Sequence, residues 1–250
     1  MKEVVAGVEQ KMDINHLLNC FVMEVNINQP ADTVSITIIS WMLNLFGPDM
    51  VQKPWNYYGD FVTTMKKENR KVHLFQIKDG RFGLLSLSCA VCIFHWEDFE
   101  KFSDSHNYIT NKLACLVRDG MQHEYVKVVA CVCAAFGVHL VIPYHYKTKG
   151  KSNHTQLQAF FADLYNNLES GVIEVEFFEF TTPAFSAVSV RLFNGVKNEC
   201  GIDVLEAVTY SAQLHIEECI LLANIMLPRL AEKLTSKRQY VKNAYLSTLV

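Results

Sequence analysis

The sequence lacks a hydrophobic segment long enough to span a membrane. Its longest apolar run, residues 128–142, has 15 residues and includes Gly137 and His139, whereas a membrane helix needs about 20. The first residues, MKEVVAGVEQKMD, mix acidic side chains with a short apolar patch, unlike a secretory or transit peptide. We therefore expect no membrane association and an intracellular protein, cytoplasmic or nuclear.

An excess of one charge is also missing. Lys and Arg total 23, Asp and Glu total 26, and the net charge is −3. This balance excludes a uniformly basic nucleic-acid coat, so any contact with nucleic acid or phosphate must be local. No linker rich in Pro, Gly or Ser divides the chain, and 50% apolar residues suffice for a core. We predict one domain over residues 1–250.

No catalytic or metal-binding motif is complete. The sequence has no G-x-S-x-G, H-E-x-x-H or kinase signature, and His215-x-Glu217 lacks the P-C-x-x-C partner of zinc deaminases. Cys89-x-x-Cys92-x-x-His95 and Cys131-x-Cys133 have spacings that zinc ligands use, but their neighbours are apolar, which favours core cysteines. We predict no metal and no cofactor.

The cysteine content indicates reduced thiols. Most of the eight cysteines lie inside apolar segments, and no secretory signal precedes them. Free buried thiols are typical of proteins in a reducing compartment. The cysteines are residues 20, 89, 92, 115, 131, 133, 200 and 219.

Helical signals dominate the first 70 residues. Asp32 is placed to cap a helix that Gly47-Pro48 ends, and Lys53-Pro54-Trp55 is placed to open another. The second helix is expected to end in the basic run 66–71.

The C-terminal part, residues 151–250, is also predicted to be helical. Residues 157–168 have helical periodicity, and a further helix is expected from Thr182-Pro183 to about residue 200. Asp203 is placed to cap a long helix. Its apolar stripe consists of Leu205, Val208, Ala212, Ile216, Cys219, Ala223 and Leu227.

Strand signals concentrate in residues 71–150. Asp79-Gly80 predicts a hairpin over residues 72–87, and 89–94 and 138–142 read as further strands. Beyond this part, residues 172–180 alternate apolar side chains with Glu and predict a strand with a bulge. Short helices are expected at 96–102, 108–117 and 122–136. The predicted fold class is α+β, with many helices packed around a small mixed or antiparallel sheet of about four to five strands.

A cationic and aromatic loop follows the apolar run. Gly150-Lys151-Ser152 stands where a P-loop ends, before a helix, but His145 occupies the position of the first glycine. A helix N-terminus can bind an anion, and cations mixed with aromatic rings suit a phosphate backbone and its bases. The predicted ligand-binding residues are Tyr144, His145, Tyr146, Lys147, Lys149, Lys151, Ser152 and His154.

These patterns favour a non-enzymatic binding or adaptor protein that contacts nucleic acid or another phosphate-bearing ligand through this loop. One alternative is an enzyme of unrecognised family that acts on a phosphorylated substrate or nucleic acid, with His145 and His154 as catalytic candidates. A second alternative is a self-assembling structural protein whose helix over 203–227 packs against a copy of itself. A protein partner or a homo-oligomer is compatible with each of these.

Overall fold

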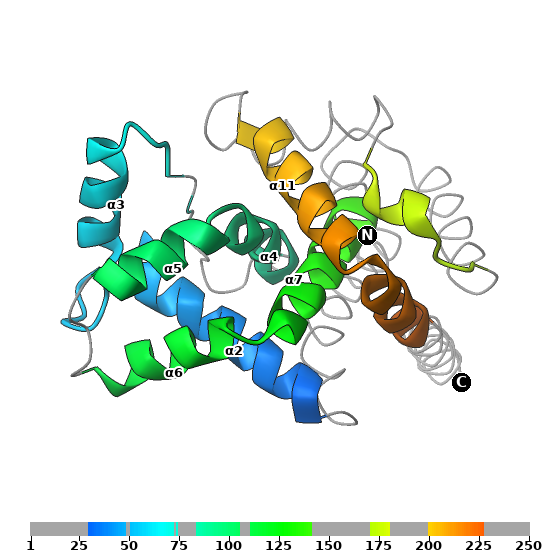
Figure 1. Ribbon diagram of the computed structural model, residues 1–250, viewed down its shortest axis with the longest axis horizontal. Coiled ribbons are helices and arrows are strands. Elements are labelled where there is room, and N and C mark those ends of the chain that lie inside the picture. The colour runs from blue at the N-terminus through cyan, green and yellow to red at the C-terminus, as the bar shows by residue number, and fades with distance from the viewer. Residues whose placement is uncertain are drawn as a thin grey trace, which may run out of the picture.

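A computed structural model of the protein describes residues 30–48, 51–72, 74, 84–105, 111–141, 171–180 and 200–227 (Figure 1). Within these ranges every regular element is a helix, and no strand occurs among them. The predicted α+β fold with a small sheet is therefore wrong for this part of the chain, which is all-helical.

In chain order, the described α-helices are α2 (Pro30–Phe46), α3 (Tyr58–Lys67), α4 (Leu84–Phe94), α5 (Trp96–Ser105), α6 (Lys112–Met121), α7 (Glu124–Phe136) and α11 (Cys200–Leu214). A π-helical turn, η4 (Gly137–Val141), continues α7, and a 3₁₀ helix, η5 (Val175–Phe178), stands alone in its segment. After a turn at His215 the chain is helical again over residues 216–227.

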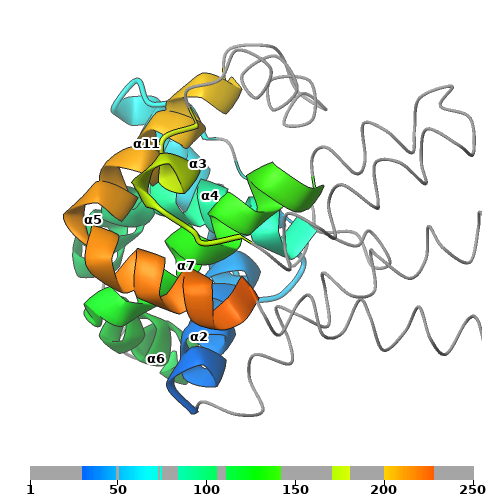
Figure 2. The same ribbon diagram turned by 90° about the vertical axis from the view of Figure 1, so that its right-hand side faces the viewer.

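Helix α7 lies at the centre, between α2, α4, α6 and α11 (Figures 1 and 2). Every residue from Val128 to Phe136 is buried. A helix that is apolar all round must be surrounded by other elements, and the stretch VVACVCAAF from Val128 to Phe136 is of this kind. The predicted helix over 122–136 is confirmed, with its start moved to Glu124.

Helix α4 explains why part of the sheet prediction failed. Its sequence, LLSLSCAVCIF, is apolar almost throughout, and Cys89 to Ile93 are buried against α7 and α11. A short apolar run suits a buried helix as well as a buried strand, and periodicity cannot separate the two. The strand predicted over 89–94 and the returning strand of the hairpin, from Leu84, are therefore wrong. The Asp79-Gly80 turn lies outside the described residues.

The two other predicted strands are helical turns as well. Residues 137–141 extend α7 as η4, because Gly137 keeps right-handed helical angles, φ −57° and ψ −47°, and does not end the helix. In 172–180 the buried side chains are Ile173, Phe178 and Phe180. Only Phe178 of these lies in the 3₁₀ turn η5, and the interval of five residues from Ile173 to Phe178 breaks the period of two that a strand requires.

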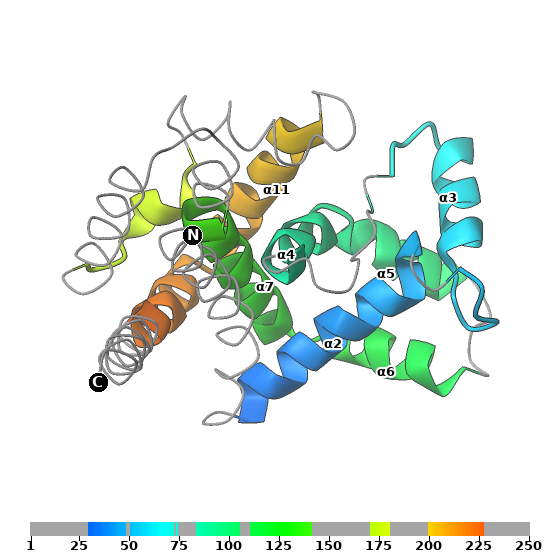
Figure 3. The same cartoon turned by 180° about the vertical axis from the view of Figure 1, so that it is seen from behind.

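Helix α2 crosses α6 closely and is best seen from behind (Figure 3). A Cβ atom built on Gly120 of α6 would lie 2.5 Å from Cδ1 of Ile38 in α2. The predicted end of α2 at Gly47 is confirmed, but the helix begins at Pro30, so Asp32 lies within its first turn and does not precede it.

Residues 51–57 close the C-terminal end of α2 and delay the start of α3 to Tyr58. The Asn56 side chain donates hydrogen bonds to the carbonyl oxygens of Asn44, at 2.8 Å, and Gly47, at 2.9 Å. The Tyr57 N–H donates to the Leu45 carbonyl at 2.7 Å. Carbonyl groups at a helix end need such donors, since they have no partner within the helix.

An aromatic cluster joins α2, α3 and α5. The rings of Phe46 and Phe99 stack with centroids 4.4 Å apart, and Phe61 and Phe102 complete the group. The helix predicted at 96–102 is confirmed as α5. The long C-terminal helix is confirmed over 203–227, apart from the turn at His215, and its predicted apolar stripe faces the core. The predicted cap is wrong, because α11 begins at Cys200 and Asp203 lies within its first turn.

None of the helices in the described ranges combines the length and the apolar composition needed to cross a membrane.

Candidate functional site

The predicted loop cannot be located in the fold. All eight predicted ligand-binding residues, from Tyr144 to His154, lie outside the described residues, and so do the catalytic candidates His145 and His154. The structure therefore neither brings these side chains together nor separates them. What it does describe are two internal polar sites and the charge of the surface.

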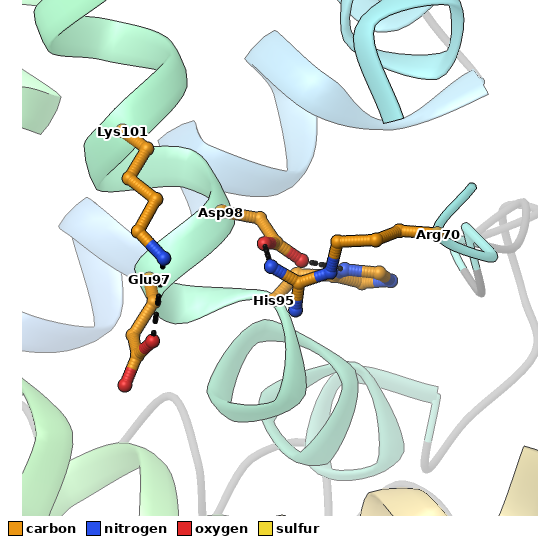
Figure 4. A network of polar contacts seen from close by, with 5 residues as sticks. All are labelled: Arg70, His95, Glu97, Asp98 and Lys101. Atoms are coloured by element: carbon orange, nitrogen blue, oxygen red, sulfur yellow. Dashed lines mark hydrogen bonds and ion pairs between the residues drawn. The ribbon is translucent and has the colours of Figure 1, made fainter. Parts of the chain in front are cut away.

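The first polar site is a buried network centred on Asp98, whose side chain is 2% exposed. One carboxylate oxygen, Oδ2, lies 3.0 Å from Nδ1 of His95. The other, Oδ1, has no hydrogen bond among the described residues but forms an ion pair with Nη1 of Arg70 (Figure 4). A buried carboxylate requires such partners, because burying an unpaired charge costs several kcal/mol.

Two helix ends bring these residues together. His95 stands between α4 and α5, where its N–H donates to the Val91 carbonyl and its own carbonyl accepts from Phe99. Asp98 follows three residues later, so both side chains lie on one side of the helix start.

Arg70 arrives from the end of α3. Asn69 has a left-handed backbone, φ 57°, and the Arg70 N–H donates to the Met65 carbonyl at 2.8 Å. The Asn69 N–H donates to the Lys66 carbonyl at 3.1 Å, which completes a Schellman motif. This turn directs Arg70 toward Asp98.

The Asp98 network has a structural role, since it links the end of α3 to the junction of α4 and α5. A carboxylate on Nδ1 of a histidine is the arrangement that orients a catalytic imidazole. Here, however, His95 is completely buried, and the rings of Phe61, Phe94 and Phe99 surround it. A substrate has no route to the ring, and only Arg70, with 41% of its side chain exposed, reaches solvent.

The cysteines near His95 do not form a metal site. Cys89 pairs with Cys133 across α4 and α7, and this hydrogen bond, together with burial, raises the pKa of Cys89. Burial raises the pKa of Cys92 to about 12. Both thiols are therefore neutral in the folded protein. Nowhere in the described ranges do three His, Cys, Asp or Glu side chains come together as metal ligands would.

The second polar site holds the segment 171–180 in place. His139 of η4 donates from Nε2 to the Phe177 carbonyl at 2.6 Å, and its ring stacks on Phe177 with centroids 4.1 Å apart. Burial lowers the pKa of His139 to about 4, so the ring is neutral at pH 7. The proton that the neutral ring keeps is therefore on Nε2.

Two side chains of the C-terminal helices fasten the same segment. Asn224 pairs with both main-chain groups of Ile173, accepting from its N–H and donating to its carbonyl, each at 2.9 Å. Thr209 of α11 donates to the Phe178 carbonyl at 3.0 Å. The main chain of 171–180 is thus held by hydrogen bonds from the side chains of His139, Thr209 and Asn224.

A hollow beside α6 is too small for an organic ligand. Its volume of about 10 Å³ is enclosed by α2, α5 and α6 together with Tyr57, which leaves room for about one water molecule. The lining residues are Leu45, Phe46, Tyr57, Ser103, Ala114, Cys115, Val117 and Arg118.

Charge is distributed unevenly over the described residues. All nine described Lys and Arg residues lie between positions 53 and 127, together with eight of the acidic residues. Residues 171–180 and 200–227, which pack on each other, contain seven acidic residues and no Lys or Arg. We call these two segments the acidic layer. The acidic residues are Glu174, Glu176, Glu179, Asp203, Glu206, Glu217 and Glu218.

Sequence patterns do not reveal the Asp98 network. They point to His95 only as a zinc ligand, and to Arg70 only as a member of a basic run. The available signal is a histidine and an aspartate three residues apart at a helix start. Their cation, Arg70, comes from another helix, and no local spacing predicts that contact.

Comparison with known proteins assigns no family to the chain. No protein-family model, no curated protein and no solved structure matches it. Its function is therefore inferred from its own residues.

Proposed function

We propose that the protein is an intracellular binding or adaptor protein, cytoplasmic or nuclear, that contacts nucleic acid through the phosphate groups of its backbone. The observation that carries this proposal is the composition of residues 144–154, where three lysines, two histidines and two tyrosines stand within 11 residues. Lysines neutralise phosphates, and aromatic rings offer stacking surfaces to unpaired bases.

The end of α3 supports the proposal with a second set of cations. Lys66, Lys67 and Lys71 are exposed at the C-terminal end of this helix, where the helix dipole favours positive charge. Arg70, in the same run, is instead paired with the buried Asp98. Lys66 and Lys67, at the last turn of α3, are therefore the members of this run that suit a phosphate backbone.

The test is binding of a fluorescently labelled 20-nucleotide oligothymidine, followed by anisotropy between 50 and 200 mM KCl. The wild-type affinity should fall steeply with salt, because bound cations release counterions from the strand. Replacing Lys147, Lys149 and Lys151 together by Gln should weaken binding tenfold or more. It should also reduce the slope of log K against log salt by about 2, at about 0.7 per phosphate contact on a single strand.

A matched variant separates a site from bulk charge. Lys53→Gln, Lys101→Gln and Lys112→Gln together remove the same three charges from exposed positions elsewhere. This control should bind within about twofold of the wild type. An affinity independent of salt, or equal losses in the two triple variants, would refute the proposal. Inorganic phosphate that displaces the oligonucleotide at low millimolar concentration would reassign the site to a small phosphate ligand.

A further inference from the structure

Helix α11 carries apolar side chains on its exposed side as well as on its buried side. Its inner face, including Val208 and Ala212, is completely buried. On the opposite side Tyr210 is 65% exposed and Leu214 is 63% exposed. A surface helix usually turns polar residues outward, so these two exposed side chains need an explanation.

The exposed residues follow helical spacing. Asp203, Glu206, Tyr210 and Leu214 stand at i, i+3, i+7 and i+11, which places them along one face of α11. All four are exposed. Beyond the turn at His215 the outer surface continues with exposed Glu217, Glu218 and Leu221.

Exposed apolar side chains concentrate in the acidic layer. Among the described residues eight large apolar side chains are exposed, and five of them belong to this layer: Val172, Val175, Tyr210, Leu214 and Leu221. Glu174, Glu176 and the acidic residues of α11 are exposed in the same two segments. The surface of the layer is therefore both apolar and negative. Figure 2 shows α11 at the edge of the molecule, with no described helix on its outer side.

We propose that this outer face is a docking surface for a cationic amphipathic helix of a protein partner. Leucine and tyrosine supply apolar anchors of the kind that a partner helix inserts between. The surrounding carboxylates select a partner with Lys or Arg beside its apolar stripe, and no Lys or Arg of the layer opposes it.

The charge also excludes other occupants. A second copy pairing through residues 203–218 would set Asp203, Glu206, Glu217 and Glu218 against the same four acidic residues of the other copy, and like charges at such an interface are unfavourable. Nucleic acid and anionic lipid are repelled for the same reason. This surface therefore serves a different partner from the cationic loop, and it does not depend on the nucleic-acid proposal.

The probe is a labelled 18-residue peptide of Leu and Lys only, with leucines at i, i+3, i+4 and i+7. We expect the wild-type protein to bind it with an affinity that weakens as salt increases. Tyr210→Ser with Leu214→Ser should weaken binding at least tenfold. Glu206→Gln with Glu217→Gln should weaken it less and reduce the dependence on salt. Because all four positions are exposed, circular dichroism should show an unchanged helix content in both variants.

Three controls decide the outcome. Val34→Ser with Leu116→Ser removes two exposed apolar side chains elsewhere and should leave peptide binding unchanged. A peptide of the same composition in scrambled order and one with Glu for every Lys should both bind at least tenfold more weakly. Equal binding of the ordered and scrambled peptides would mean attraction by charge alone and would overturn the proposal.

The oligomeric state gives an independent result. We expect the Tyr210→Ser, Leu214→Ser double variant to show the same dependence of mass on concentration in light scattering as the wild type. A dimer that this pair dissolves would show that a second copy covers the face, and the proposal would be wrong.

Discussion

Removing the Arg70 side chain should destabilise the protein through Asp98. In Arg70→Met the stem remains but the charge is lost, and the hydrogen bond from the Arg70 N–H to the Met65 carbonyl is untouched. The substitution leaves Asp98 Oδ1 buried without its ion-pair partner.

The magnitude follows from the burial of the two partners. Breaking a fully buried pair by removing one member costs about 3–5 kcal/mol. Arg70 is 41% exposed, so water can reach the vacated position and reduce the penalty. We expect a loss of about 2–3 kcal/mol in the free energy of unfolding. In an Asp98→Asn background, where a neutral amide still accepts from His95, Arg70→Met should cost less than about 1 kcal/mol.

Urea unfolding followed by circular dichroism measures both values. Lys66→Met, four positions earlier on the exposed end of α3, is the matched control and should change stability by no more than about 0.5 kcal/mol. If Arg70→Met costs no more than Lys66→Met, or if its cost is the same in the wild-type and Asp98→Asn backgrounds, the ion pair does not stabilise this fold.

Two further predictions concern His139 and Gly120. The folded state keeps His139 neutral down to about pH 4, whereas the unfolded chain takes up its proton near pH 6.5. The free energy of unfolding should therefore decrease as the pH falls between these values, by roughly 3 kcal/mol in total. Urea midpoints at pH 7, 6 and 5 should show this loss relative to His139→Gln, which has no imidazole to titrate; parallel curves would contradict it. Gly120→Ala should destabilise by about 1–3 kcal/mol because Ile38 fills the space of the new methyl group. Gly59→Ala places its methyl group in open space on α3 and should leave the stability unchanged or raise it. Equal changes of melting temperature in the two variants would show that the contact between position 120 and Ile38 does not cause the destabilisation.

The helices that sequence reasoning predicts correctly have a polar side or a clear boundary. Helix α5 alternates charged and aromatic residues with a helical period, and α2 ends at Gly47. The errors fall where burial removes that contrast. Helix α4 and the turn η4 are apolar almost throughout, with His139 the only ionisable residue of η4, so no polar face reveals a helical period.

The strand prediction within segment 171–180 failed for a different reason. Its alternating Glu residues indicate a wet and a dry face, which is the usual mark of a strand. In the fold the main chain of this segment bonds to the side chains of Asn224, Thr209 and His139, so it needs no neighbouring strand. These partners lie about 30 to 50 positions away in the sequence, and local patterns carry no information about them.

The net charge of −3 is a poor guide to what this protein can bind. At physiological salt, charges on the surface are screened beyond about 8 Å, so a partner senses the nearest patch and not the whole molecule. Lysines of the predicted loop and of α3 therefore remain able to attract phosphates, even though acidic residues are in excess overall. The same screening leaves the acidic layer able to attract a cationic helix, because no described Lys or Arg lies within it. The two proposals therefore predict that each partner responds only to substitutions in its own patch.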